Sequence, residues 1–270
     1  MADRGRSVRV DAVVITCEHG GRNVPAAYRN EFAAHRKLLE SHRGWDPGAL
    51  ELARRFAKAL KVPLLFSKTT RLLVELNRSA GHPGLFSQAT RDLPIEVRQA
   101  ILERYYNPYR NEVESAIGKL IKARKTVLHL SVHSFTPELH GEVRRADIGF
   151  LYDPGRFTEC VVVDRWRKEL VGHPNGIALA SVVPNARAKE SNCARQQVST
   201  LVVRRNYPYR GAADGFTTYL RRRFPVTRYL GIELEVNQAF VFGPKRQWLQ
   251  IQEALVSTLI DALAHDRRRA

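Results

Sequence analysis

Short apolar runs of strand length alternate with longer amphipathic segments along this chain, and this alternation limits the possible folds more than any other feature. The apolar runs cover residues 12–17, 62–67, 72–76, 126–132, 148–152 and 229–236. Helical periodicity covers residues 47–61, 94–124, 156–171, part of 211–224, and 248–265. Strands that alternate with helices are typical of an α/β fold in which helices pack on a sheet. The pattern therefore predicts an α/β sandwich.

Two of the predicted helices carry local signals near proline. Asp46 precedes Pro47 at the start of the 47–61 segment, where an aspartate can cap the helix and proline can occupy its first position. Asn107 and Pro108 lie inside the 94–124 segment, and a proline in a helix interior removes a backbone hydrogen bond. We expect an interruption of the helix there.

The chain is 270 residues long and 44% hydrophobic, which is enough for a sizeable core. It shows no internal repeat and no low-complexity linker, so we expect a single domain over residues 1–270. No run approaches the ~18 consecutive apolar residues that a membrane span requires. The N-terminus lacks the apolar stretch of a signal peptide. The cysteines Cys17, Cys160 and Cys193 form no CxxC pair, and the expected location is the cytoplasm.

The formal net charge is +17, and three interpretations follow from it. A basic surface can bind nucleic acid, but no recognition motif is present and we expect no specific nucleic-acid partner. The charge can also belong to an ordinary solvated surface, because the arginines are spread along the chain. Positive potential can also attract an anionic substrate.

Reactive side chains gather near the ends of the predicted strands, where α/β sheets bind their ligands. His19 follows the first strand, His133 closes the 126–132 strand, and Glu235 lies near the end of the 229–236 strand. Two histidines and a carboxylate, such as that of Asp46, are a common ligand set for a catalytic zinc. A further carboxylate beside the site can act as a general base. The pattern is compatible with a metallohydrolase.

Each of these residues also has a purely structural interpretation. A histidine at a strand end can be an ordinary packing residue, and Asp46 can serve only as a helix cap. Glu233 and Glu235 share one face of their strand because side chains alternate, so spacing alone does not choose between them.

Seven segments of the chain resemble, in order, the motifs of the N-formylglutamate amidohydrolase family. They run from about residue 12 to 240: 17–21 with 23–25 (CEHGG, NVP), 42–49 (HRGWDPGA), 71–78 (RLLVELNR), 106–110 (YNPYR), 133–137 with 147–149 (HSFTP, DIG), 206–209 with glycines 211 and 215 (NYPY), and 235–237 (EVN). Each segment is a weak signal, but seven in the right order are specific.

The resemblance implies a three-layer α/β sandwich with a mixed, mostly parallel sheet flanked by helices. It also implies one zinc ion per chain, with another divalent metal as an alternative, bound by His19, an acidic residue and His133. Asp46 best matches the acidic ligand. A His-x-x-Glu pair is absent because Arg22 is the third residue after His19, and Glu18 is the alternative ligand. Glu235 matches the general base.

The family resemblance gives roles to several cations and amides. N-formylglutamate carries two carboxylates, and a planar guanidinium pairs with a carboxylate through two hydrogen bonds. The expected substrate-binding residues are Arg71, Asn77, Arg78, Asn206 and Arg210.

The expected function is therefore zinc-dependent hydrolysis of a small, anionic N-acyl amino acid such as N-formylglutamate. Two alternatives remain open. One is a carboxypeptidase or amidase that acts on a peptide or cell-wall fragment, because a fold does not fix a substrate. The other is a non-catalytic nucleic-acid-binding protein on the same scaffold.

Overall fold

A six-stranded mixed sheet forms the centre of the protein. The computed structural model describes residues 8–173 and 201–264. The strands are β1 (Ala12–Cys17), β2 (Leu64–Phe66), β3 (Val127–Phe135), β6 (Ile148–Leu151), β7 (Val203–Arg205) and β8 (Tyr229–Asn237), in the order β2-β1-β3-β8-β6-β7. The first four strands in this order are parallel, while β6 is antiparallel to β8 and parallel to β7. The predicted α/β sandwich with a mostly parallel sheet is confirmed.

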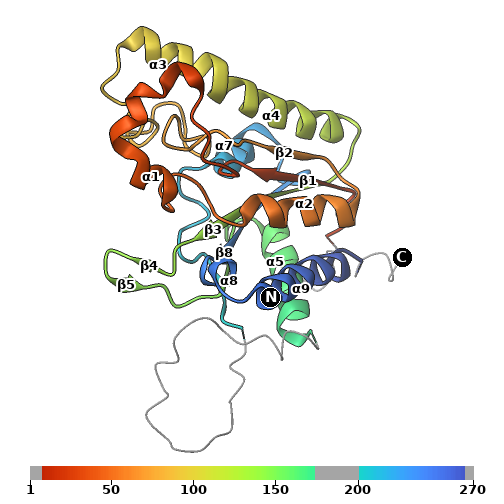
Figure 1. The fold of residues 1–270 in the computed structure, drawn as a ribbon. Helices are drawn as coiled ribbons and strands as arrows, with labels where there is room; N and C mark the ends of the chain where they lie inside the picture. Colours follow the sequence, from red (N-terminus) through yellow and green to blue (C-terminus); the bar gives the residue numbers. More distant parts are fainter. Residues whose placement is uncertain (1–7, 174–200, 265–270) are drawn as a thin grey trace, which may run out of the picture.

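Helices cover both faces of this sheet (Figure 1). One face packs against α2 (Ala49–Leu60), α5 (Phe157–Gly172) and α9 (Lys245–Ala264). The other packs against α4 (Asn107–Lys122) and α7 (Phe216–Arg223). The smaller elements are 3₁₀ turns at Ala26–Tyr28 and Asn30–His35, α1 (Arg36–Glu40), α3 (Ile95–Ile101), a π-helical segment at Leu102–Tyr106, a hairpin of β4 (Glu138–Leu139) and β5 (Glu142–Val143), and α8 (Ala239–Phe242).

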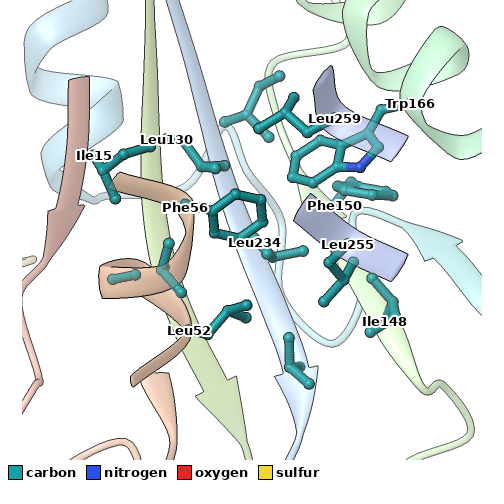
Figure 2. Close-up of a cluster of buried hydrophobic side chains, with 14 of the residues drawn as sticks. Ile15, Leu52, Phe56, Leu130, Ile148, Phe150, Trp166, Leu234, Leu255 and Leu259 are labelled. Carbon is teal, nitrogen blue, oxygen red and sulfur yellow. The ribbon is translucent and has the colours of Figure 1, made fainter. Parts of the chain in front are cut away.

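The face toward α2, α5 and α9 carries a large cluster of buried apolar side chains (Figure 2). Alternate residues of the strands, among them Ile15, Leu130 and Leu234, point to this side because side chains alternate along a strand. Phe56 of α2 meets Trp166 of α5 edge-on, with ring centroids 5.9 Å apart. This core fixes the positions of the strands whose other face carries the polar groups.

The opposite face changes character along the strands. Near the start of the strands it is apolar, with Val14, Val127 and Tyr229 packed against α4 and α7. Toward the carboxyl ends the same face carries Glu18, Ser131, His133, Glu233 and Glu235, all buried. Buried polar groups are costly unless they are paired. The fold therefore gathers these buried polar side chains at the carboxyl edge of one face of the sheet.

The prediction of a strand over residues 72–76 is wrong. Leu72, Leu73 and Leu76 lie in turns, Val74 and Glu75 have irregular backbone, and all five residues are buried. The segment is held by loop contacts, with the backbone N–H of Leu73 bonded to the carbonyl oxygen of Thr70, and that of Glu75 to Leu85. Periodicity alone does not distinguish a buried apolar loop from a buried strand.

The two proline signals have outcomes that differ from the expectation. Helix α2 begins at Ala49, after Gly48 in the left-handed conformation at φ 78°, and Asp46 makes no side-chain cap. The segment around Asn107 stays helical, and a π-helical turn precedes Pro108, which lies in the first turn of α4. A π turn changes the local hydrogen-bond pattern without ending the helix.

No helix in the described part of the chain has the length and apolar character needed to cross a membrane.

Candidate active site

His19, Asp46 and His133 come together at the carboxyl edge of the sheet. His19 lies just after β1, His133 lies within β3, and Asp46 lies in the loop before α2. Asp46 Oδ2 is 3.3 Å from His19 Nδ1 and 3.0 Å from His133 Nδ1. All three residues are buried, and one nitrogen or oxygen atom from each lies within 4.8 Å of the others. Two imidazoles and a carboxylate in this arrangement can bind a divalent metal.

Backbone hydrogen bonds hold these three residues in place. The N–H of Asp46 donates to the carbonyl oxygen of His19 at 2.9 Å, which ties the loop before α2 to the end of β1. Strand β3 pairs with β1 on one side and β8 on the other, and this pairing fixes His133 opposite Glu235. The site therefore rests on the sheet rather than on loops alone.

Two further carboxylates lie behind the other nitrogen of each histidine. Glu75 Oε1 is hydrogen-bonded to His19 Nε2. His133 Nε2 is hydrogen-bonded to Ser131 Oγ at 2.7 Å, and Glu18 Oε2, 3.3 Å from the same nitrogen, accepts a 2.6 Å hydrogen bond from that hydroxyl. The Nδ1 atoms of both histidines are thereby turned toward Asp46. Carboxylates behind histidine ligands are typical of metal sites, where they fix ring orientation and raise ligand basicity.

The alternative ligand Glu18 is thus placed behind His133 and not between the two histidines. Its Oε1 accepts a 2.9 Å hydrogen bond from Tyr109 OH, so both of its oxygens have partners on the α4 side. Burial acts to raise the pKa of Glu18, but the hydrogen bond and charge of His133 hold that pKa well below its usual range. Glu18 therefore acts on His133 as a charged acceptor.

Opposite charges in this cluster stabilise one another. Arg71 Nη1 donates to Asp46 Oδ1 at 3.2 Å, and Arg71 Nε donates to Glu75 Oε2 at 2.7 Å. Burial acts to raise the pKa values of Asp46 and Glu75, yet the nearby His19 and Arg71 hold both well below their usual range. Burial acts to lower the pKa of His133, while Asp46 and Glu18 raise it well above its ordinary value. For each of these groups, the charged partners therefore shift the pKa more strongly than desolvation does.

The two candidate bases on β8 have different surroundings. Glu233 Oε1 accepts a hydrogen bond from Thr217 Oγ1 at 2.5 Å, and its Oε2 accepts one from Asn77 Nδ2 at 3.4 Å. Glu235 Oε2 is buried and has no hydrogen-bond partner among the described residues. Burial, with Asp46 and Glu233 nearby, raises the pKa of Glu235 to about 8. The free oxygen of Glu235 is the one available to a ligand.

A glycine on the neighbouring strand lets a loop approach Glu235. Gly149 of β6 lies opposite Glu235 in the sheet. A Cβ atom at this position would lie 1.9 Å from the carbonyl oxygen of Tyr207. Because Gly149 has no side chain, the segment that contains Tyr207 can pass close to the site.

These residues surround a cavity of about 310 Å³. Its lining consists of His19, Asp46, Arg71, Glu75, Asn77, Arg78, His133, Ser134, Leu151, Tyr209, Arg210, Ala213, Asp214, Glu233 and Glu235. The cavity is large enough for a small amino-acid derivative and brings a carboxylate-rich centre together with several arginines.

Four of the five expected substrate-binding residues line this cavity, and they differ in how many bonds they already make to other protein groups. Arg71 is paired with Glu75 and Asp46. Asn77 uses its Oδ1 to accept the N–H of Phe216 at 2.7 Å. Both residues therefore already support the protein.

The remaining three differ in their freedom to meet a ligand. Arg78 donates one bond, from Nη1 to the carbonyl oxygen of Asp214 at 2.7 Å, and Arg210 is exposed at the cavity wall. Asn206 does not line the cavity, and its Oδ1 accepts the N–H groups of Tyr152 and Gly211 at 3.1 and 3.0 Å. The side chain of Asn206 therefore stabilises the backbone around it.

Sequence reasoning missed Glu75, Ser131 and Tyr109. The signal for Glu75 was a lone carboxylate within the apolar run LLVEL, because a buried carboxylate requires a partner. Ser131 and Tyr109 carry no comparable signal in the sequence, since their role depends on how β3 and α4 meet Glu18.

Two solved structures share the fold across nearly the whole chain. One is a gene product from Agrobacterium tumefaciens, with a TM-score of 0.74, 24% identity, and coverage of 94% of this chain and 91% of that chain. The other is an N-formylglutamate amidohydrolase from Ralstonia eutropha JMP134, with a TM-score of 0.65, 17% identity, and coverage of 97% and 96%. At these identities the likeness establishes the fold. No curated protein matches the chain.

The N-formylglutamate amidohydrolase family model matches residues 11–242, which include every residue of the cluster around His19, Asp46 and His133. Amidohydrolases are enzymes that hydrolyse an amide bond. The match covers well over half of the 270 residues, and the chain belongs to the N-formylglutamate amidohydrolase family.

Proposed function

We propose that this chain hydrolyses the amide bond of N-formylglutamate, or of a closely similar N-acyl amino acid, with one zinc ion bound per chain. The observation that carries the proposal is the buried His19, Asp46 and His133 group on the same cavity as Glu235. Family membership supports the reaction class.

The donor set fits zinc. Two imidazole nitrogens and one carboxylate oxygen are ligands that zinc prefers, and three protein ligands leave a position for a reactant. The second nitrogens of His19 and His133 are held by Glu75 and Glu18, so the Nδ1 atoms are oriented toward a common point near Asp46. These residues would hold the ion.

When bound, zinc would polarise the acyl carbonyl and lower the pKa of an attacking water toward about 7. Glu235 has a buried carboxylate oxygen without a partner among the described residues, so in its ionised form it can accept the proton that this water loses. It then delivers that proton to the amide nitrogen as the C–N bond breaks. The products are formate, or another small acid, and the free amino acid.

Arg78 and Arg210 give the cavity its affinity for anions. Arg78 has donors beyond its one hydrogen bond to Asp214, and Arg210 lies exposed at the wall. A guanidinium can hold a carboxylate through two parallel hydrogen bonds and so orient the acyl group. The substrate is accordingly a small acylated amino acid that carries at least one carboxylate, and the enzyme is proposed to act in the cytoplasm.

The test is metal analysis combined with hydrolysis of N-formylglutamate before and after chelation. About one zinc per chain, with turnover lost on chelation and restored by zinc, would support the proposal in full. Zinc binding without turnover would favour the alternative substrates, a peptide or a cell-wall fragment. A protein that binds no metal even when zinc is supplied, and instead binds random DNA in a salt-sensitive way, would refute it.

A further inference from the structure

A second cavity of about 250 Å³ adjoins the first and shares four of its lining residues. The shared residues are Asp46, Arg71, Ser134 and Tyr209. A formyl group has a single carbon atom, so neither the reacting group nor the metal site accounts for this additional space. The residues that line only the second cavity are His42, Arg43, Phe135, Thr136 and Arg144.

Arg144 is the unusual member of this set. It lies directly after β5 and is only 9% exposed. Its guanidinium carbon lies over two aromatic rings, 5.0 Å from the ring centroid of Tyr209 and 5.9 Å from that of Phe135. Aromatic faces stabilise a cation but accept none of its in-plane N–H bonds.

The other two buried arginines of the described chain have acceptors. Arg221 donates to both carboxylate oxygens of Glu159 and to two backbone carbonyls. Arg110 donates to the carbonyl oxygens of Leu76 and Arg78. Within residues 8–173 and 201–264, the guanidinium of Arg144 has neither a hydrogen bond nor an ion pair. The side chain of Arg144 is mostly covered by protein, yet its N–H donors are not sealed off and have no protein acceptor among the described residues, so they are open to a ligand in the cavity.

The surroundings of Arg144 are electropositive. Arg43 lies exposed on the same cavity. Burial lowers the pKa of His42 below its ordinary value, and the charge of Arg144 lowers it further. The one carboxylate of this lining, Asp46, is already engaged by Arg71 and the two histidines. Among the described residues, the lining of the second cavity therefore has cationic donors and no free carboxylate.

We propose that Arg144 binds a carboxylate of the substrate in this second cavity, so that the site selects N-acylated dicarboxylic amino acids over monocarboxylic ones. The inference rests on the proposed function, because it takes the scissile amide to lie at the His19, Asp46 and His133 group. One carboxylate of the substrate pairs with Arg144, and the other is left to Arg78 and Arg210 in the first cavity. A planar guanidinium matches a carboxylate in two-point geometry, which gives both affinity and selectivity.

The test compares the zinc-loaded full chain with Arg144→Gln and Arg144→Lys, and uses Arg145→Gln as the matched control. Arg145 is the neighbouring residue and is exposed, and its replacement by glutamine removes the same single positive charge as Arg144→Gln. Calorimetric titration with glutarate and with butyrate measures dicarboxylate preference without turnover. Kinetics on N-formylglutamate and N-formylnorvaline measure the same preference during catalysis.

Arg144→Gln should weaken glutarate binding about 10- to 100-fold, as expected for loss of charge-assisted hydrogen bonds, and should reduce the preference for glutarate over butyrate. Arg144→Lys should give an intermediate loss, and it serves as the second variant if Arg144→Gln does not fold. Arg145→Gln should match the wild type within about twofold, since an exposed charge contributes little.

The inference is overturned if the wild type shows no preference for glutarate, or if Arg144→Gln and Arg144→Lys both retain it with full zinc content. An equal loss in Arg145→Gln would also overturn it, because general charge would then explain the effect. Glutarate binding that depends on Arg144, in a protein that hydrolyses no N-formylglutamate, would sustain this inference and refute the proposed function.

Discussion

One oxygen of the Glu75 carboxylate is hydrogen-bonded to His19 Nε2, and the other accepts a hydrogen bond from Arg71. His19 therefore turns its other nitrogen, Nδ1, toward Asp46, whose Oδ2 lies 3.3 Å away. This relationship places a loop residue that is distant in the sequence behind His19, a proposed metal ligand. The orientation of His19 is thereby set by Asp46 from the loop before α2 and by Glu75, which Arg71 of its own loop holds in place.

The first prediction concerns this partner. Glu75→Gln should reduce zinc affinity about 10- to 100-fold, because the amide keeps the shape but loses the charge that raises the basicity of His19. Competition with a chromogenic chelator measures the change. Glu112→Gln, at an exposed position on α4, is the control and should leave zinc affinity unchanged. Equal affinities in all three proteins would remove Glu75 from the metal site.

The second prediction separates the two candidate acidic ligands. Asp46→Asn should prevent stoichiometric zinc binding, since its Oδ2 lies near both histidine Nδ1 atoms. Glu18→Gln should retain zinc with about 10- to 100-fold weaker affinity, because Glu18 acts only through His133. Metal content after dialysis at graded zinc concentrations gives the answer. Zinc retained by Asp46→Asn and lost by Glu18→Gln would reverse the assignment.

The third prediction concerns the base. Glu235→Gln should keep zinc but lower kcat for N-formylglutamate by about 10²- to 10⁴-fold, the usual contribution of a general base. Glu233→Gln is the comparison on the same face of β8, and its loss should be smaller because both oxygens of Glu233 already bind protein groups. Substantial turnover in Glu235→Gln would refute the role.

The fourth prediction concerns stability at low pH. His129 is fully buried between Thr16 and Tyr229, and burial lowers its pKa to about 4, well below the value of about 6.5 in the unfolded chain. The unfolded state therefore binds a proton first as pH falls. This neutral histidine contributes stability above pH 6.5 that is lost progressively between about pH 6.5 and 4.

The full loss from His129 amounts to about 3 kcal/mol below pH 4. Urea unfolding of zinc-free protein at several pH values, with His129→Gln as the comparison, measures this contribution. The difference in unfolding free energy between the two proteins should shrink as pH falls across that window. A difference that stays constant with pH would show that His129 does not titrate as described.

Sequence patterns predicted the sheet well because alternation and strand length are local properties. The strands at 12–17 and 229–236 follow from apolar runs, and β3 was also expected, although it extends through Phe135 and so includes His133. The error over residues 72–76 has a physical cause. A buried loop needs the same apolar residues as a buried strand, and only its hydrogen-bond partners distinguish the two.

The centre of the site was predictable to the extent that its residues follow strands. His19 and His133 meet because the parallel strands β1 and β3 end at one edge, whereas Asp46 reaches them from the loop before α2. Glu75 and Arg144 could not be found this way. Glu75 depends on the path of a loop. Arg144 is one of 44 lysines and arginines, and it is distinguished only in the fold, by burial without a protein acceptor for its guanidinium among the described residues. Asn206 fitted a motif, but in the fold its side chain binds backbone groups.

Strand β6 runs in the reverse direction, and this determines which segment of the chain connects it to β3. Because β6 runs antiparallel to β8, the chain that leaves β3 must turn at the carboxyl edge, and it does so through the β4–β5 hairpin that leads to Arg144 (Figure 1). His133 and Glu235 are locked into paired strands, whereas each strand of the hairpin has only two residues. A change in this short hairpin would leave the paired strands that carry His133 and Glu235 intact. Under the proposed roles, the reacting groups and the residue that selects the substrate therefore lie on separate segments of the chain.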